Sequence, residues 1–283
     1  MDRRHERDGD RLMEATVAVL RLPGVNCEIE TARACAVAGL RPEIVRWNDA
    51  EAKLESFDAF VLPGGFSFQD RVRAGVVAAN EPVLEIVVEQ AEAGKPVLGI
   101  CNGAQVLVEC GLVPGMVPGA VEVALAPNAE PGYECRWVFS APSPIGASPF
   151  VRGLAREGPI PMPVAHAEGR FVSGDASLFT ALHHAGQLAF RYVSHDGEAT
   201  GDHNPNGAEL DTAGMVNCSG NVLALMPHPE RSAWLRQVPT WLPGSWGRKR
   251  REAAGRPELL DAPGPGMAVF RALARAAMER REG

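Results

Sequence analysis

The sequence lacks the signals of a membrane protein, a disulfide-rich protein or a nucleic-acid-binding protein. No apolar run reaches the roughly 20 residues that cross a bilayer, and the charged start, MDRRHERDGDRLME, has no apolar core of the kind that a signal peptide needs. The six cysteines form no CxxC pair, which favours free thiols in a reducing compartment. The net charge of -7 disfavours general nucleic-acid binding, because phosphate contacts need a basic excess. We therefore expect a cytoplasmic protein without a membrane or nucleic-acid partner.

Phosphate-binding glycine patterns are also missing. The sequence contains no G-x-x-x-x-G-K-[ST] loop and no G-x-G-x-x-G after a strand. We therefore expect no nucleotide cofactor on this chain. We also expect no metal site, because the histidines at 183, 184, 195 and 203 lie in polar stretches that are typical of solvated side chains.

Strand and helix signals alternate along the first half of the chain. The expected strands are 15–20, 43–47, 59–62 and 97–100, and the expected helices are 27–39, 82–93 and 105–110. This alternation predicts an α/β fold with a mostly parallel sheet and helices on both faces. The turns LPGVN, LPGG and ICNG follow three of these strands, so we expect them at the ligand-binding rim formed by the carboxyl ends.

The second half predicts a different arrangement. Short apolar runs within 120–140 and 160–195 indicate extra antiparallel strands, followed by a buried strand at 222–225 and a helix at 267–278. Residues 234–266, which include the basic run Arg248–Arg251, are interpreted as a loop insert. We expect residues 1–14 to be disordered or frayed and residues 15–283 to form a single domain.

Cys101 stands in the sequence Gly99-Ile100-Cys101-Asn102-Gly103, directly after an apolar strand and before a helix. The pattern G-x-nucleophile-x-G in this context is typical of a nucleophile elbow, in which the glycines make room for a sharp turn. A helix N-terminus after the cysteine would favour the thiolate. A buried structural thiol is the alternative, and we prefer it for the other cysteines, namely Cys27, Cys35, Cys110, Cys135 and Cys218. At Cys101 the context favours a nucleophile.

A base for this nucleophile is predicted in Met226-Pro227-His228-Pro229-Glu230. Residues i and i+2 of an extended segment point the same way, so Glu230 can orient His228 as the third member of a triad. A surface histidine in a Pro-rich turn is the alternative, and it would be preferred if the elbow were absent.

Backbone donors for an oxyanion are expected on two turns. Gly64 and Gly65 follow a strand and can bring backbone N–H groups close to a ligand, while Asn102 N–H lies next to the nucleophile. An ordinary β-turn is the alternative for the glycine pair.

These motifs together resemble class I glutamine amidotransferases, and within that class the glutaminase subunits of phosphoribosylformylglycinamidine synthase. The resemblance runs from about residue 15 to residue 231. The segments that carry it are LPGVNC (22–27), PGGFS (63–67), RAG (73–75), CNGAQ (101–105), NPNG (204–207) and MPHPER (226–231).

The resemblance implies a flavodoxin-like sheet and hydrolysis of L-glutamine to glutamate and ammonia. Cys101 would be the nucleophile, His228 the base and Glu230 its orienter. The oxyanion and substrate-binding positions would be Gly64, Gly65, Asn102 and Gln105. Ammonia would pass to a partner synthetase that converts formylglycinamide ribonucleotide to formylglycinamidine ribonucleotide in purine biosynthesis. ATP and Mg would be bound by that synthetase, and a small bridging subunit can complete the complex.

Two positions depart from the family pattern, and two other functions stay open. The family usually has an aromatic residue at Ala104 and a glycine at Gln69, and it usually lacks a segment like 234–266. A peptidase or deglycase with the same elbow is disfavoured, because its histidine usually adjoins the nucleophile, where Asn102 stands. A catalytically silent regulatory scaffold is disfavoured by the complete triad.

Overall fold

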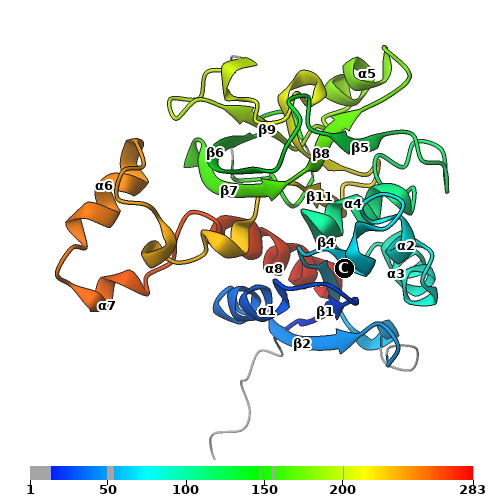
Figure 1. Cartoon of the computed structure of the whole chain (residues 1–283). Coiled ribbons are helices and arrows are strands. Elements are labelled where there is room, and N and C mark those ends of the chain that lie inside the picture. Colours follow the sequence, from blue (N-terminus) through cyan, green and yellow to red (C-terminus); the bar gives the residue numbers. More distant parts are fainter. Residues whose placement is uncertain (1–13, 50–53, 147, 155–156, 200, 283) are drawn as a thin grey trace, which may run out of the picture.

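The computed structural model describes residues 14–49, 54–146, 148–154, 157–199 and 201–282. Residues 1–14 were predicted to be disordered or frayed, and all of them except Glu14 lie outside these ranges. A nine-stranded sheet forms the centre of the molecule, in the order β2-β1-β3-β4-β11-β10-β9-β6-β7 (Figure 1). None of the described helices is long and apolar enough to cross a bilayer.

Five neighbouring strands form the parallel part of the sheet. They are β2 (Arg41–Arg46), β1 (Thr16–Arg21), β3 (Ala59–Leu62), β4 (Val97–Ile100) and β11 (Val222–Leu225). The last three are completely buried, as continuous apolar runs covered on both faces should be. The strands expected in the first half and at 222–225 are all confirmed.

Helices cover this parallel part. The α-helices of this half and of the C-terminus are α1 (Glu28–Val37), α2 (Val76–Ala79), α3 (Pro82–Glu92), α4 (Asn102–Glu109) and α8 (Met267–Glu282). Helix α4 packs against β3, β4 and β11, while α1 packs against β1, β2 and α8. The predicted α/β class is therefore confirmed, and the helical period in the sequence located each long helix to within a few residues.

The second half extends the sheet with antiparallel strands. Strands β6 (Glu134–Pro142), β7 (Ile160–His166) and β9 (Phe190–Val193) lie in or overlap the predicted runs, whereas β10 (Thr212–Val216) was not predicted. A separate pair is formed by β5 (Ala124–Pro127) and β8 (Glu168–Val172), and α5 spans Leu178–His184. Short 3-10 turns lie at Leu54–Ser56, Ser67–Asp70, Gly201–His203, Glu209–Asp211, Pro229–Arg231 and Leu235–Gln237.

The segment 234–266, interpreted as a loop insert, contains two short helices joined by turns, which corrects that part of the sequence interpretation. It contains α6 (Gly244–Glu252) and α7 (Pro257–Leu260), drawn in orange beside the sheet in Figure 1. Its own small apolar cluster is formed by Leu235, Val238, Leu242 and Ala253, against which Trp137, Phe139 and Trp246 pack. The basic run Arg248–Arg251 lies on α6. This helix was not predicted because it has too few apolar residues to produce a helical period in the sequence.

Candidate active site

Cys101 lies on a sharp turn between β4 and α4. Its φ of 49° and ψ of -105° are strained for a residue with a Cβ atom, and its N–H donates to the carbonyl oxygen of Leu225 at 2.8 Å. A Cβ on Gly103 would lie 1.9 Å from the Leu62 oxygen, and one on Gly99 would lie 2.6 Å from the Gly103 oxygen. These close approaches explain why both glycines flank the cysteine. They hold the thiol at the N-terminus of α4.

His228 and Glu230 reach the same rim from the neighbouring strand. β11 pairs in parallel with β4, with Leu225 opposite Ile100, so the segments that leave these strands lie side by side. The Nδ1 atom of His228 lies 2.5 Å from Oε1 of Glu230, and both side chains are buried. The backbone N–H of His228 donates to the carbonyl oxygen of Pro163 at 2.8 Å. The carboxylate therefore fixes the orientation of the ring.

The pKa of His228 results from opposing effects. Burial lowers it, whereas the Glu230 carboxylate and the sulfur atoms of Cys101 and Cys27 raise it, and the net pKa lies well above the ordinary value. A protonated imidazole at this place is the natural counter-ion of a thiolate at Cys101.

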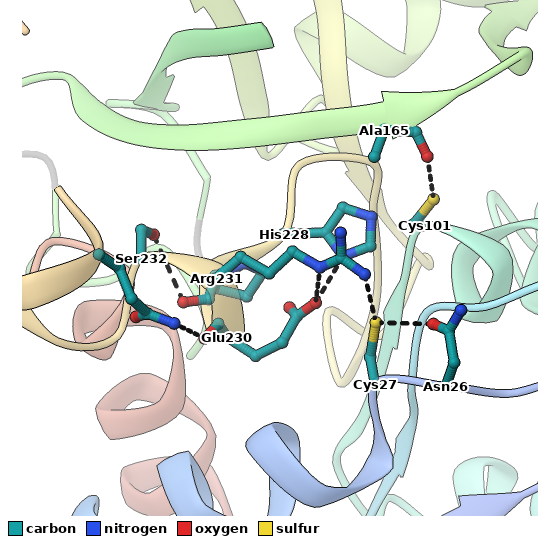
Figure 2. Close-up of polar contacts among 10 residues, drawn as sticks. Asn26, Cys27, Cys101, Ala165, His228, Glu230, Arg231 and Ser232 are labelled. Carbon is teal, nitrogen blue, oxygen red and sulfur yellow. Dashed lines mark hydrogen bonds and ion pairs between the residues drawn. The ribbon is translucent and has the colours of Figure 1, made fainter. Parts of the chain in front are cut away.

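Cys101 and His228 face each other across a short gap. Figure 2 shows Cys101 beside the imidazole, on a different side from Cys27. Among the described residues, Nε2 of His228 has no hydrogen-bond partner, and the Sγ atom of Cys101 lies 3.6 Å from the carbonyl oxygen of Ala165. Catalytic hydrogen bonds often tighten only when substrate binds. The structure thus brings the three predicted side chains together and leaves Nε2 available to the thiol.

The two predicted oxyanion donors belong to turns that are held rigidly. Within the described ranges, the N–H groups of Gly65 and Asn102 donate to no protein acceptor. The Gly64 oxygen accepts from the Asn26 N–H at 3.3 Å, and a Cβ on Gly65 would lie 2.6 Å from the Val25 Cα. The LPGVN turn therefore packs directly on the glycine pair and fixes its backbone.

The side chains of Asn102 and Gln105 have structural partners that the sequence did not reveal. Asn102 Oδ1 accepts from Ser67 N–H at 3.0 Å, and its Nδ2 donates to Asp70 Oδ1 at 3.2 Å and to Gln105 Oε1 at 2.9 Å. Gln105 Nε2 in turn donates to the Glu168 carbonyl oxygen at 2.5 Å. These bonds join the elbow to the loop that follows the glycine pair.

Cys27 is the residue of the site that sequence analysis missed. It is buried, as expected, but its sulfur, a nitrogen of His228 and an oxygen of Glu230 lie within 4.8 Å of one another. Such a set could hold a metal ion. However, the guanidinium of Arg231 already lies 3.1 Å from the sulfur and 3.7 Å from Glu230 Oε1. We therefore describe a charge-paired cluster and assign no metal to it. No local pattern marks Cys27, because only tertiary packing joins residues 27 and 231.

Two further titratable groups border the site. Burial, together with the nearby His228, lowers the pKa of His166 to about 4, so this imidazole is neutral at neutral pH. Its Nδ1 lies 3.1 Å from Oδ1 of Asn128. Burial, followed by the charge of Glu168, raises the pKa of Asp70 to about 6.

Comparison with known proteins identifies the family. Residues 14–273 match the sequence family described as the CobB/CobQ-like glutamine amidotransferase domain. Phosphoribosylformylglycinamidine synthase subunit PurQ of Methanothrix thermoacetophila is 40% identical, over 94% of this chain and 99% of its own length. The chain belongs to the PurQ family of glutamine amidotransferases. The PurQ protein of Thermus thermophilus is 42% identical over 76% of this chain and 88% of its own length.

Solved structures agree with this membership. A chain of the structure described as PurLQS from Thermotoga maritima is similar with a TM-score of 0.69 and 30% identity, over 93% of this chain and 99% of that chain. A putative GMP synthase protein from Thermoplasma acidophilum has a TM-score of 0.50 and 15% identity, over 95% of this chain and 96% of that chain, which supports the fold alone.

Proposed function

We propose that this chain is the glutaminase subunit of a phosphoribosylformylglycinamidine synthase and that Cys101 is its nucleophile. The observation that carries the assignment is the strained elbow at Cys101 beside the buried His228–Glu230 pair. Cys27 is the rival thiol. It has no elbow, and burial raises its pKa despite the opposing contacts with His228 and Arg231, which disfavours the thiolate that a nucleophile needs.

The mechanism follows from these positions. The Cys101 thiolate attacks the carboxamide carbon of L-glutamine, and the N–H groups of Asn102 and Gly65 stabilise the oxyanion. His228 donates its proton to the leaving nitrogen, which departs as ammonia and leaves a thioester on Cys101. Neutral His228 then takes a proton from water as it attacks the thioester, and glutamate leaves as the Cys101 thiolate and the protonated imidazole are restored. Glu230 holds the imidazole orientation throughout.

The partner synthetase completes the reaction. Ammonia passes to this synthetase, which converts formylglycinamide ribonucleotide to formylglycinamidine ribonucleotide and binds the ATP and Mg. A small bridging protein can join the complex. The names of the similar proteins support this division. The relative from Methanothrix is named as the PurQ subunit of the synthase, and the similar solved structure is described as PurLQS. We place the reaction in the cytoplasm, which the six free cysteines support.

The first test separates ammonia production from ammonia use. In the complex with the synthetase, Cys101→Ala should abolish glutamine-dependent synthesis while ammonia-dependent synthesis persists. Cys218→Ala, at an exposed cysteine outside the site, is the matched control and should retain both activities. Loss of both activities in Cys101→Ala, or survival of the glutamine-dependent one, would contradict the proposal.

The second test identifies the reactive thiol. A glutamine analogue with a diazoketone should alkylate Cys101 alone, as read by peptide mass spectrometry. Labelling of Cys27 would show that Cys27 is the nucleophile and would contradict the assignment of Cys101. Absence of any label in the complex would favour a catalytically silent scaffold.

A further inference from the structure

The cluster of Cys27 and Arg231 behind the imidazole is not used by the mechanism above. Glu230 is completely buried, and its Oε2 atom has no hydrogen-bond partner among the described residues. After the His228 ring, the nearest cation within the described ranges is the Arg231 guanidinium, whose Nε lies 3.7 Å from Oε1. A buried carboxylate without a compensating charge is costly, so the position of this guanidinium affects the Glu230–His228 pair directly.

Arg231 is not held in place by burial, because its side chain is 41% exposed. The contact that ties its far end to the protein is the bond from Nη2 to the Cys27 sulfur at 3.1 Å. The Cys27 thiol in turn donates to Asn26 Oδ1 at 3.2 Å, and its backbone N–H donates to the Gly64 oxygen at 3.2 Å. The sulfur is therefore oriented on both sides, with its lone pairs toward the guanidinium.

The same sulfur packs against the imidazole. A Cβ placed on Gly64 would lie 2.6 Å from Cε1 of His228 and 3.4 Å from the Cys27 sulfur, so both side chains line the same small space. Figure 2 shows Cys27 below the ring, with Arg231 reaching across Glu230 toward it. A thiol fits this space because sulfur is a weak, polarisable acceptor that can contact both a cation and a ring edge.

We propose that Cys27 is a positioning residue of the glutaminase reaction, whose sulfur fixes Arg231 beside Glu230 and supports the imidazole of His228 from a different side than the nucleophile. This inference rests on the proposed function. Within the described part of the chain, the charged and titratable groups around His228 are Glu230 and Arg231 on its own segment, Cys27 before α1, Cys101 on the elbow, His166 on β7 and Tyr133 before β6.

The test compares two ways of changing the thiol in the complex with the synthetase. Cys27→Ala removes the acceptor for Arg231, so we expect glutaminase kcat to fall about tenfold or more while KM changes little. The alkaline limb of the kcat/KM profile should move to lower pH, because the sulfur no longer favours the protonated imidazole. Cys27→Ser keeps a donor for Asn26 and an acceptor for Arg231, and it should return both readouts toward wild type.

Cys35→Ala is the matched control. Cys35 is an equally buried thiol on α1, and burial raises its pKa to about 12. We expect its replacement to lower thermal stability without moving the pH profile. A double variant, Cys27→Ala with Arg231→Gln, should lose less activity than the two single variants would together, because the two residues share one contact.

The outcomes separate this inference from the proposed function. A wild-type profile and kcat in Cys27→Ala, a Cys27→Ser variant as impaired as Cys27→Ala, or additive losses in the double variant would each overturn the positioning role. Diazoketone labelling of Cys101 in Cys27→Ala would leave the proposed function intact. Labelling that survives Cys101→Ala and disappears in Cys27→Ala would overturn both, since Cys27 would then be the nucleophile.

Discussion

The side-chain oxygen of Asn102 accepts a 3.0 Å hydrogen bond from the backbone N–H of Ser67. Asn102 follows Cys101 on the elbow, and Ser67 lies two residues after Gly65. This contact therefore joins the two turns that carry the proposed oxyanion donors. The spacing of the donors depends on it, because both residues are buried and the bond is not exchanged with water.

Replacing Asn102 should damage catalysis through this contact. Asn102→Ala leaves the buried Ser67 N–H without its acceptor, which costs about 1–3 kcal/mol of unfolding free energy. We expect glutaminase kcat to fall about 100-fold, the scale of losing one oxyanion donor. Asn80→Ala, which removes an exposed bond from Nδ2 to the Val76 oxygen, is the control and should keep full activity. Equal kcat values for the two variants would show that the contact does not position the donors.

Gly64 should tolerate no side chain. The Cβ of an alanine would lie 2.6 Å from Cε1 of His228, so the imidazole must shift from its position beside Cys101. A displacement of this size can cost about 100-fold in rate. Gly64→Ala should lose that activity while its circular dichroism stays native. At Gly174 a Cβ would meet no atom within 4 Å, and Gly174→Ala should behave as wild type. Full activity of Gly64→Ala would contradict the position of the His228 imidazole next to Gly64.

Asp70 should make stability depend on pH. Burial and Glu168 raise its pKa from 3.8 to about 6, so the folded state binds the proton more tightly than the unfolded state. Stability from this group is present below about pH 4 and is lost as pH rises through about 6. Asp70→Asn should therefore gain on the order of 1 kcal/mol relative to wild type between about pH 4 and about pH 8, since the carboxyl is half-exposed and partly screened. Urea unfolding at several pH values measures this difference.

A carboxylate with the opposite shift provides the comparison for Asp70. The hydroxyl and backbone N–H of Ser177 lower the pKa of Asp175, so its stabilisation is present above the unfolded pKa and is lost as pH falls. Asp175→Asn should lose stability relative to wild type as pH rises. If the stability of both variants relative to wild type changed in the same direction with pH, the opposite pKa shifts assigned to Asp70 and Asp175 would be contradicted.

The protein should be more stable with glycine in place of Gln69, because glycine is the residue that the family usually carries there and the backbone is left-handed. The φ of Gln69 is 62°, a left-handed conformation that costs a residue with a side chain about 1–2 kcal/mol. Part of the gain is offset by the flexibility of glycine in the unfolded chain. Gln69→Gly should therefore raise the unfolding free energy by about 0.5–1 kcal/mol. Gln69→Ala loses the same exposed contact with Arg71 but keeps the strain, so it should not be stabilised. A higher unfolding free energy for Gln69→Ala than for Gln69→Gly, measured by chemical denaturation, would contradict the backbone strain at this position.

Local sequence signals were sufficient to predict the parallel strands, the long helices and the proposed triad, but not strand β10. Strand β4 and the elbow at Cys101 could be predicted because apolar runs, glycines and capping signals act over a few residues. His228 and Glu230 were predicted for the same reason, as they stand two residues apart after a buried strand. Residues 234–266 were interpreted as a loop because their two short helices carry few apolar residues. Most of the residues in the apolar cluster of this segment lie outside the two helices.

Tertiary structure alone decided what surrounds the reactive groups. The bonds from Ser67 to Asn102 and from Arg231 to Cys27 join residues 35 and 204 positions apart, and no local pattern encodes them. They form because parallel strands bring distant turns to one rim, where each buried polar group must find a partner. By itself, the sequence predicted which residues react. Only the packing of the turns determined that a second thiol lies against the histidine and that an arginine joins this thiol to the glutamate.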